Sequence, residues 1–177
     1  MDISHIPTFA DDGAFHVVVE SPRGATVKLK FHPVLRAIVW GRPLTSGLSY
    51  PFDWGFIAGT HASDGDPVDA MVLWEGSTYP GVVVPCRALG LVKVEQDRKD
   101  APGRERNDRV IAVPAIAPLW ENRQDLMELP ARLRDELAAF FLQATLFESK
   151  NAIVLGFDGA SEARRLIEQA AGSPARS

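Results

Sequence analysis

The chain has 177 residues, of which 46% are hydrophobic and 24% are charged. These values are typical of a folded globular domain and exclude a disordered chain, a collagen-like repeat and a coiled coil. The net charge of −4 argues against nucleic acid as the main partner. A single cysteine, Cys86, excludes an internal disulfide and any cysteine-based metal site.

The length suits one domain over residues 1–177, with a loose tail at 172–177. No apolar run approaches the roughly 18 residues that cross a bilayer, so no membrane partner is predicted. The first twenty residues contain four acidic side chains and lack the apolar core of a signal peptide. We therefore expect a cytoplasmic location.

The first part of the chain has the pattern of short β-strands. Residues 26–31 alternate polar and apolar side chains, so Lys28 and Lys30 share one face of a half-buried strand. Residues 41–67 contain five glycines and three prolines among aromatic residues, and we expect an ordered loop there. The other predicted strands cover 15–20, 37–40, 68–74, 81–95, 109–113 and 152–157.

Helical periodicity appears only late in the chain. Apolar residues follow the helical rhythm up to Ala144, and Pro130 suits the first turn because its missing N–H has no partner there. A second helix is expected from Ser161, as the N-cap, to about Ala171, with Gly172 as its end. Many strands followed by two helices predict an α+β fold, a small β-barrel with the helices packed outside.

Residues 98–109, RKDAPGRERNDR, form the most charged segment, with eight charged residues in twelve. Pro102 and Gly103 lie in its middle and favour a turn. We interpret this segment as a solvated hairpin loop.

The strongest functional signal is the acidic segment DGDPVD at 64–69. Its three carboxylates, Asp64, Asp66 and Asp69, repel one another unless a cation or an arginine neutralises them. Carboxylate oxygens are hard ligands that suit Mg²⁺ or Mn²⁺. An EF-hand loop is excluded because Val68 and Asp69 stand where that loop needs a ligand and a glycine. A plain acidic surface turn remains the alternative.

Several side chains elsewhere complement these carboxylates. Lys28, Arg42 and Tyr50 can hold phosphate oxygens, and Glu20 can hold a further metal ion. The chain has no Walker loop and no G-x-G-x-x-G segment, which argues against an ordinary nucleotide-binding fold. Cys86, in an apolar VVVPC setting, is expected to be buried rather than a nucleophile.

In their order along the chain, these segments resemble the soluble family I inorganic pyrophosphatases. The resemblance is carried by YPFDWGFI at 50–57, followed by DGDPVD at 64–69, and it spans about residues 15–160. Further segments that fall where the family has counterparts are VVVE at 17–20, PCRALG at 85–90, VIAVP at 110–114 and the two phenylalanines of the first helix.

The resemblance implies a five-stranded OB-like β-barrel with two helices outside, and hydrolysis of diphosphate to two phosphates. It implies several Mg²⁺ ions, with Asp64 and Asp69 as metal ligands, Glu20 facing an outer metal, and Asp66 as the general base that deprotonates the attacking water. It also implies a homo-oligomer. The phosphate contacts that it implies are Lys28, Arg42, Tyr50 and Arg109.

The sequence departs from the family pattern in the other half of the implied site. A family aspartate after the K-x-E strand end is Gln96 here, and a second one, shared between metals, is Asn107. The phosphate-binding lysine two residues later is Arg109. A position on the second strand that is usually acidic in the family is Lys30.

A Tyr-Lys pair that binds the outer phosphate in the family is replaced by Ala144 and Thr145. Together the changes predict a weaker cation site and reduced activity, because a hard-cation site depends on its number of charged ligands. The alternative is an altered or non-catalytic relative that binds diphosphate or a phosphate ester directly through Lys28, Lys30, Arg42 and Arg109. A structural or interaction role for the barrel is the third hypothesis.

Overall fold

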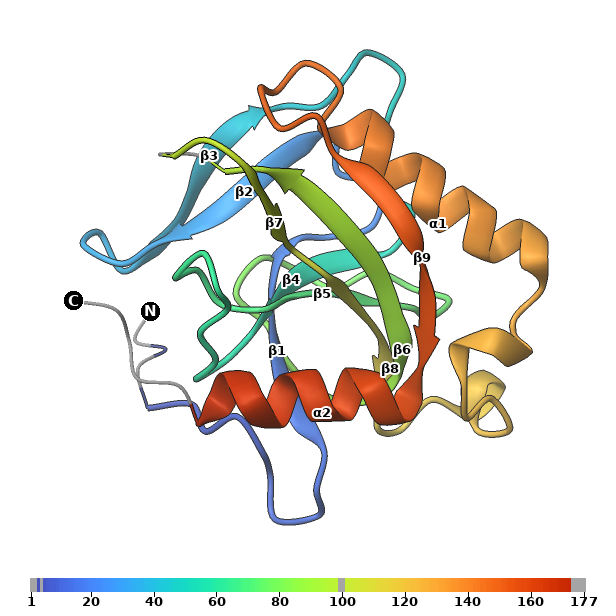
Figure 1. The fold of residues 1–177 in the computed structure, drawn as a ribbon. Helices are drawn as coiled ribbons and strands as arrows, with labels where there is room; N and C mark the ends of the chain where they lie inside the picture. Colours follow the sequence, from blue (N-terminus) through green and yellow to red (C-terminus); the bar gives the residue numbers. More distant parts are fainter. Residues whose placement is uncertain (1–2, 4, 99–100, 173–177) are drawn as a thin grey trace.

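The computed structural model describes residues 3, 5–98 and 101–172 (Figure 1). Its strands are β1 (Phe15–Ser21), β2 (Val27–His32), β3 (Ala37–Pro43), β4 (Asp53–Ile57), β5 (Asp69–Val72), β6 (Val83–Asp97), β7 (Arg104–Arg106), β8 (Arg109–Pro114) and β9 (Ile153–Gly159). Its helices are α1 (Ala131–Ala144) and α2 (Ala160–Ala171), with short 3-10 turns at Pro118–Trp120 and Leu126–Glu128. Most of the predicted tail, 173–177, lies outside the described residues. No helix in the described part of the chain is long and apolar enough to cross a membrane.

Five strands close into a ring. β1 pairs with β4, β4 with β5, β5 with β8, β8 with β6, and β6 pairs again with β1. The β5–β8 pair is parallel and the others are antiparallel. β7 and β9 extend the sheet from β6, while β2 and β3 form a separate two-stranded sheet. The α+β prediction is confirmed, and the ring is consistent with the predicted OB-like barrel.

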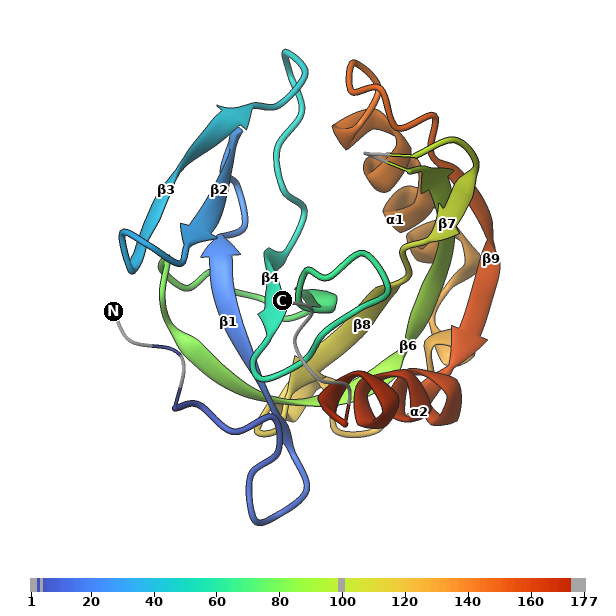
Figure 2. The same cartoon turned by 60° about the vertical axis from the view of Figure 1, so that its left-hand side comes forward.

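The long strand β6 connects the ring to the site. Its first part pairs with β1 and its last part pairs with β7 and β9. β6 and β7 form an antiparallel hairpin, and β7 lies within the charged segment 98–109 that was predicted to be a hairpin loop throughout. In Figure 2 the β2–β3 hairpin stands on one side and β7 and β9 stand on the other, with the loop after β4 between them.

The expectation of a loop over 41–67 is wrong at β4. All five residues of this strand are buried, so no alternation of polar and apolar side chains marks it in the sequence. Gly55 lies against the backbone of β1, where a Cβ would overlap the carbonyl oxygen of Val18. The glycine that favours a loop in the sequence is therefore needed for the close approach of two strands.

The two helices pack on different parts of the core outside the ring, as predicted. Leu137, Phe140 and Phe141 of α1 belong to one apolar cluster with residues of β4, β5, β6 and β8. Ile167 and Ala170 of α2 belong to a second cluster, mostly with residues of β1, β5 and β8. Each helix thus covers the ring with one apolar face, which removes that face from water.

The helix starts differ by one residue for α1 and by two residues for α2 from the prediction. Pro130 occupies the N-cap of α1 rather than its first turn. Helix α2 begins at Ala160, so Ser161 is not its cap. The carboxylate of Asp125 accepts a hydrogen bond from the Ala160 N–H at 2.9 Å. The N-cap residue, Gly159, offers no side-chain hydrogen bond, and this distant carboxylate satisfies the first N–H of the helix instead.

Cys86 is buried on β6, which confirms the expectation for this residue. Burial raises the pKa of its thiol, with a further contribution from the charge of Asp53. The reactive thiolate is therefore disfavoured.

Candidate functional site

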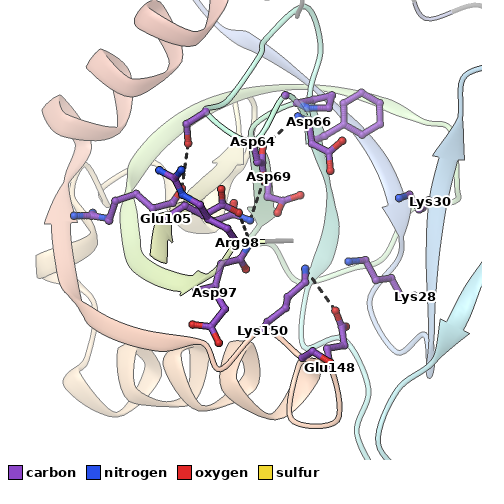
Figure 3. Close-up of a pocket in the computed structure, with 18 of the residues that line it drawn as sticks. Lys28, Lys30, Asp64, Asp66, Asp69, Asp97, Arg98, Glu105, Glu148 and Lys150 are labelled. Atoms are coloured by element: carbon purple, nitrogen blue, oxygen red, sulfur yellow. Dashed lines mark hydrogen bonds and ion pairs between the residues drawn. The ribbon is translucent and has the colours of Figure 1, made fainter. Parts of the chain in front are cut away.

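A large polar cavity of about 1350 Å³ lies between β2, the loop after β4, the ends of β6 and β7, and the loop between α1 and β9. Figure 3 shows Asp64, Asp66 and Asp69 together on one side of this cavity. Basic side chains, among them Lys28 and Lys150, point into the cavity from other sides. The cavity therefore has walls of opposite charge.

The acidic wall is shaped by local hydrogen bonds. The buried hydroxyl of Thr60 accepts the Val68 N–H at 3.0 Å, which fixes the end of the loop before β5. The Asp64 carboxylate accepts the backbone N–H of Asp66 at 3.1 Å. Gly65 has a φ of +88°, a left-handed conformation that glycine adopts without strain. The turn thereby gathers carboxylates that are adjacent in the sequence.

The carboxylates of this wall crowd one another. Burial raises the pKa of Asp64, and the negative charges of Asp66, Asp69 and Glu105 raise it further. The side-chain amide of Asn107 donates to the other Asp64 oxygen at 3.3 Å. A cation placed here would relieve the repulsion, as the sequence analysis argued from spacing alone.

Glu20 is a buried carboxyl at the edge of the same cavity. Its Oε1 accepts the Phe31 N–H at 2.5 Å. Burial raises the pKa of Glu20 to about 7, and the charge of Asp69 adds to the rise, whereas the Phe31 hydrogen bond and Lys28 oppose it. Near neutral pH, this side chain is therefore divided between its neutral and charged forms.

Arg109 is buried next to the acidic wall and pairs with it. Its Nη1 lies 3.0 Å from Asp69 Oδ2. The same nitrogen donates to the Asn107 carbonyl at 2.7 Å and also contacts the Asn107 side-chain oxygen. The guanidinium carbon lies 5.8 Å from the ring centre of Trp54. Arg109, which was expected to contact phosphate, thus neutralises Asp69, which was expected to bind metal.

A smaller pocket adjoins the cavity and holds the remaining predicted residues. There Tyr50 is buried against the rings of Trp54 and Phe140, and burial raises its pKa to about 12. The cavity is lined by Glu20, Lys28, Asp64, Asp66 and Asp69. The smaller pocket is lined by Arg42, Tyr50 and Arg109, and it shares Lys28, Asp69, Gln96 and Lys150 with the cavity.

Arg42 is held by the α1–β9 side of the molecule rather than facing the large cavity. Its Nη2 donates to the Ala144 carbonyl at 2.6 Å and pairs with Glu148. Glu148 also lies 3.5 Å from Lys150 Nζ (Figure 3). Neither Glu148 nor Lys150 was predicted as a site residue. They lie in a short loop with no motif, and only the absence of the family's Tyr-Lys pair pointed to this region.

The cations of the site crowd one another in the same way as the carboxylates. Burial lowers the pKa of Lys28 and of Lys150. The charges of Arg42 and Arg109 lower both pKa values further, whereas Asp69 opposes the change. An anion placed among these side chains would relieve their repulsion.

The side chains at and near the positions where the resemblance led us to expect aspartates have other partners. Gln96 lines the cavity and donates to Glu105 at 3.4 Å, while its own oxygen is buried without a hydrogen-bond partner among the described residues. Asp97 lines the cavity too, but it pairs with Arg104 at 2.8 Å. Asp108 accepts the Val94 N–H at 3.0 Å and lies outside the cavity lining.

The donor set fits an open cation site. Among the described residues, no three or more His, Cys, Asp or Glu side chains are arranged as a preformed metal cage. Mg²⁺ is usually bound by one or two carboxylates, completed by water and substrate oxygens. Asp64, Asp69 and Glu20 all line the cavity and supply hard oxygens of this kind.

The chain is similar throughout to one group of enzymes. The sequence model of the Pyrophosphatase family, described as inorganic pyrophosphatase, matches residues 17–173. The inorganic pyrophosphatase of Nostoc sp. is 31% identical over 169 residues, which is 96% of each chain. That of Haloferax volcanii is 35% identical over 156 residues, covering 88% of this chain and 85% of the relative. The solved inorganic pyrophosphatase from Thermus thermophilus has a TM-score of 0.88 at 30% identity, with 97% of both chains covered.

Proposed function

The chain belongs to the inorganic pyrophosphatase family, and on this premise we propose that its cavity hydrolyses inorganic diphosphate to two phosphates. The resemblance found in the sequence is thereby confirmed. One observation supports this cavity as the reaction site: the acidic wall and the basic side chains face the same space. Attack of an activated water on a polyanion needs carboxylates that hold the metal and the water, and it needs cations that hold the polyanion.

The basic side chains would hold the substrate. Diphosphate carries several negative charges, which repel an anionic nucleophile unless cations neutralise them. Lys28 and Lys30 line the cavity from β2, and Lys150 lines it from the α1–β9 loop. Arg42 and Tyr50 would contact phosphate from the smaller pocket.

The acidic wall would hold the metal on which this family depends. Mg²⁺ is the ion that the hard carboxylate oxygens of Asp64, Asp69 and Glu20 favour, and Mn²⁺ suits the same donors. A bound ion supplies charge neutralisation and a lowered pKa of its water. Arg109 would support the phosphate side indirectly, because it is already paired with Asp69.

Asp66 would act as the general base. It lies exposed at the tip of the acidic turn and lines the cavity. Its backbone N–H is bound by Asp64, which fixes its position. No hydrogen bond within the described residues occupies its carboxylate, so the oxygens can accept a proton from a water in the cavity.

The alternative, a relative that only binds diphosphate or a phosphate ester, is not favoured. The relatives that match the whole chain are named as enzymes. The structure also keeps all three carboxylates of the acidic wall in the cavity, where simple anion binding would be weakened by their charge.

Phosphate release from diphosphate during a Mg²⁺ titration tests the proposal. We expect Mg²⁺-dependent release by the wild type and a loss of about a hundredfold or more in Asp66→Asn, the size typical of a general base. The matched control is Asp135→Asn, at an exposed position of α1, and it should match the wild type. A wild type that releases no phosphate at millimolar Mg²⁺ or Mn²⁺ would contradict the proposal.

A homo-oligomer and a cytoplasmic location complete the proposal. Both follow from family membership rather than from a contact in the single chain. Sedimentation at micromolar concentration should give a species heavier than the 19.3 kDa chain. A species of monomer mass would contradict the expected oligomer.

A further inference from the structure

The loop between α1 and β9 places one carboxylate between two cations of the site. One oxygen of Glu148 pairs with Arg42, and the other lies 3.5 Å from Lys150 Nζ. All three side chains remain partly exposed, at 31% for Arg42, 23% for Glu148 and 32% for Lys150, so a small solute can reach them. The two cations belong to segments more than one hundred residues apart, and Glu148 is the group that joins them.

The surrounding charges show that Glu148 has more than one cation to neutralise. Lys28 lies close enough to Lys150 and Arg42 for their positive charges to lower its pKa. In Figure 3, Lys28 and Lys150 both direct their ammonium groups into the cavity. Within the described residues Lys28 forms no ion pair, and the nearby Asp69 is already paired with Arg109. Glu148 thus contacts two of these three cations, Arg42 and Lys150, and Asp69 is the acidic neighbour of Lys28.

A phosphate group would satisfy this cluster better than a carboxylate. Guanidinium and ammonium groups bind phosphate oxygens through the same charge-assisted hydrogen bonds that they make to carboxylates, and phosphate offers more oxygens and more charge. The small residues Ala144 and Thr145 line the pocket beside Arg42, so no other cation comes from the end of α1. Lys150, from the following loop, lines both the cavity and this pocket.

We propose that Lys150 is a further phosphate-contacting residue and that Glu148 is an internal placeholder for the phosphate group between Arg42 and Lys150. When phosphate binds, it displaces the Glu148 carboxylate from both cations; when phosphate leaves, the carboxylate returns. Glu148 therefore weakens phosphate binding and eases the release of product. The inference rests on the proposed function, because it takes phosphate to be the group that enters the site.

Calorimetric titration of the Mg²⁺-loaded protein with inorganic phosphate tests the placeholder. Glu148→Gln should bind phosphate about tenfold more tightly, a gain of about 1.4 kcal/mol, because the variant no longer has a charged group that competes with phosphate. Glu148→Asp should change in the same direction, because its shorter side chain cannot reach both cations. The control is Glu136→Gln, which alters an equivalent arginine pair on the exposed face of α1 and should leave the affinity unchanged.

Lys150→Met tests the phosphate contact and should weaken phosphate binding about tenfold, a loss of about 1.4 kcal/mol. Its control is Lys93→Met, which removes a lysine of similar exposure that pairs with Asp158 at 2.9 Å on β9. In the Glu148→Gln, Lys150→Met double variant, the gain from Glu148→Gln should shrink, because the two residues act at one place.

Equal or weaker phosphate binding by both Glu148 variants would overturn the placeholder, and unchanged binding by Lys150→Met would overturn the contact. Phosphate release from diphosphate, measured on the same samples, separates these failures from a failure of the proposed function. An active wild type with unchanged Glu148 variants contradicts the inference alone. An inactive wild type whose Glu148 variants bind phosphate more tightly contradicts the proposed reaction alone.

Discussion

The two halves of the site are built in different ways. The acidic half, Asp64, Asp66 and Asp69, comes from one short turn whose hydrogen bonds are mostly local. The altered half, made of Gln96, Asn107, Arg109 and Lys150, is assembled from the end of β6, the start of β8 and the α1–β9 loop. The acidic half has the carboxylates that the resemblance led us to expect. The altered half has Gln96 and Asn107 where the resemblance led us to expect carboxylates, and its contacts come from residues distant in sequence.

Arg109 shows how the altered half acts on the acidic half. Its guanidinium pairs with Asp69 and is fixed by Asn107, so one expected metal ligand has a permanent cation beside it. Removing one partner of such a buried pair is costly, which holds the arrangement in place. We expect a site that binds Mg²⁺ more weakly than one with aspartate at position 107.

The largest effect should come from the acidic half. Asp64→Asn keeps the hydrogen bond to the Asp66 N–H but removes one charge from the cation site. We expect a loss of about a hundredfold in Mg²⁺ affinity and a similar loss of diphosphate hydrolysis. Calorimetry with Mg²⁺ and phosphate release measure the two quantities. Wild-type Mg²⁺ affinity in this variant would show that the acidic half is only a surface turn.

Restoring the altered half should have the opposite effect. Aspartate at both Gln96 and Asn107 returns two carboxylates to positions that line the cavity. We expect about tenfold tighter Mg²⁺ binding and higher activity. Asn122→Asp, at an exposed position away from the cavity, controls for added charge. A folded double variant with neither change would mean that these two positions do not face the metal.

Glu20 should make stability depend on pH in the metal-free protein. Its pKa is raised from 4.5 to about 7 in the folded state, so the folded protein holds a proton that the unfolded chain releases. The free energy of unfolding therefore falls as the pH rises from about 4.5 to 7 and then levels off. The total decrease is roughly 3 kcal/mol.

Glu20→Gln removes this titration. With EDTA present, the variant should be more stable than the wild type at pH 8 by roughly 2–3 kcal/mol, and no more stable at pH 4.5. Urea denaturation at the two pH values measures the difference. The exposed Glu75→Gln serves as the control and should follow the wild type. An equal gain at both pH values would assign the effect to packing instead of charge.

The smallest effect should come from Lys30, which is exposed on β2 at the edge of the cavity. With EDTA present, Lys30→Glu should weaken phosphate binding about threefold, because charge pairs open to solvent contribute little. The wild-type affinity should fall as salt is added. With Mg²⁺ in place of EDTA, the same variant should bind phosphate more tightly than the wild type. Equal phosphate affinity of wild type and variant would show that Lys30 is only a solvated lysine.

The sequence by itself determined the features that depend on neighbouring residues. The acidic turn follows from carboxylates two and three positions apart with glycine between them, and the lysines of β2 follow from the period of a strand. The family resemblance, the α+β class and the two helices were also readable, because apolar periodicity and motif order are properties of the chain itself.

The tertiary structure decided the features that join distant parts of the chain, namely the buried strand β4 and the ion pairs between separate elements. β4 could not be recognised because a strand buried on both faces has no alternation and because its glycine meets the backbone of β1. The pairing of Arg109 with Asp69, and of Arg42 with Glu148, joins residues from separate elements. Long charged side chains choose partners by distance in space and by burial, and no local pattern in the sequence records either quantity.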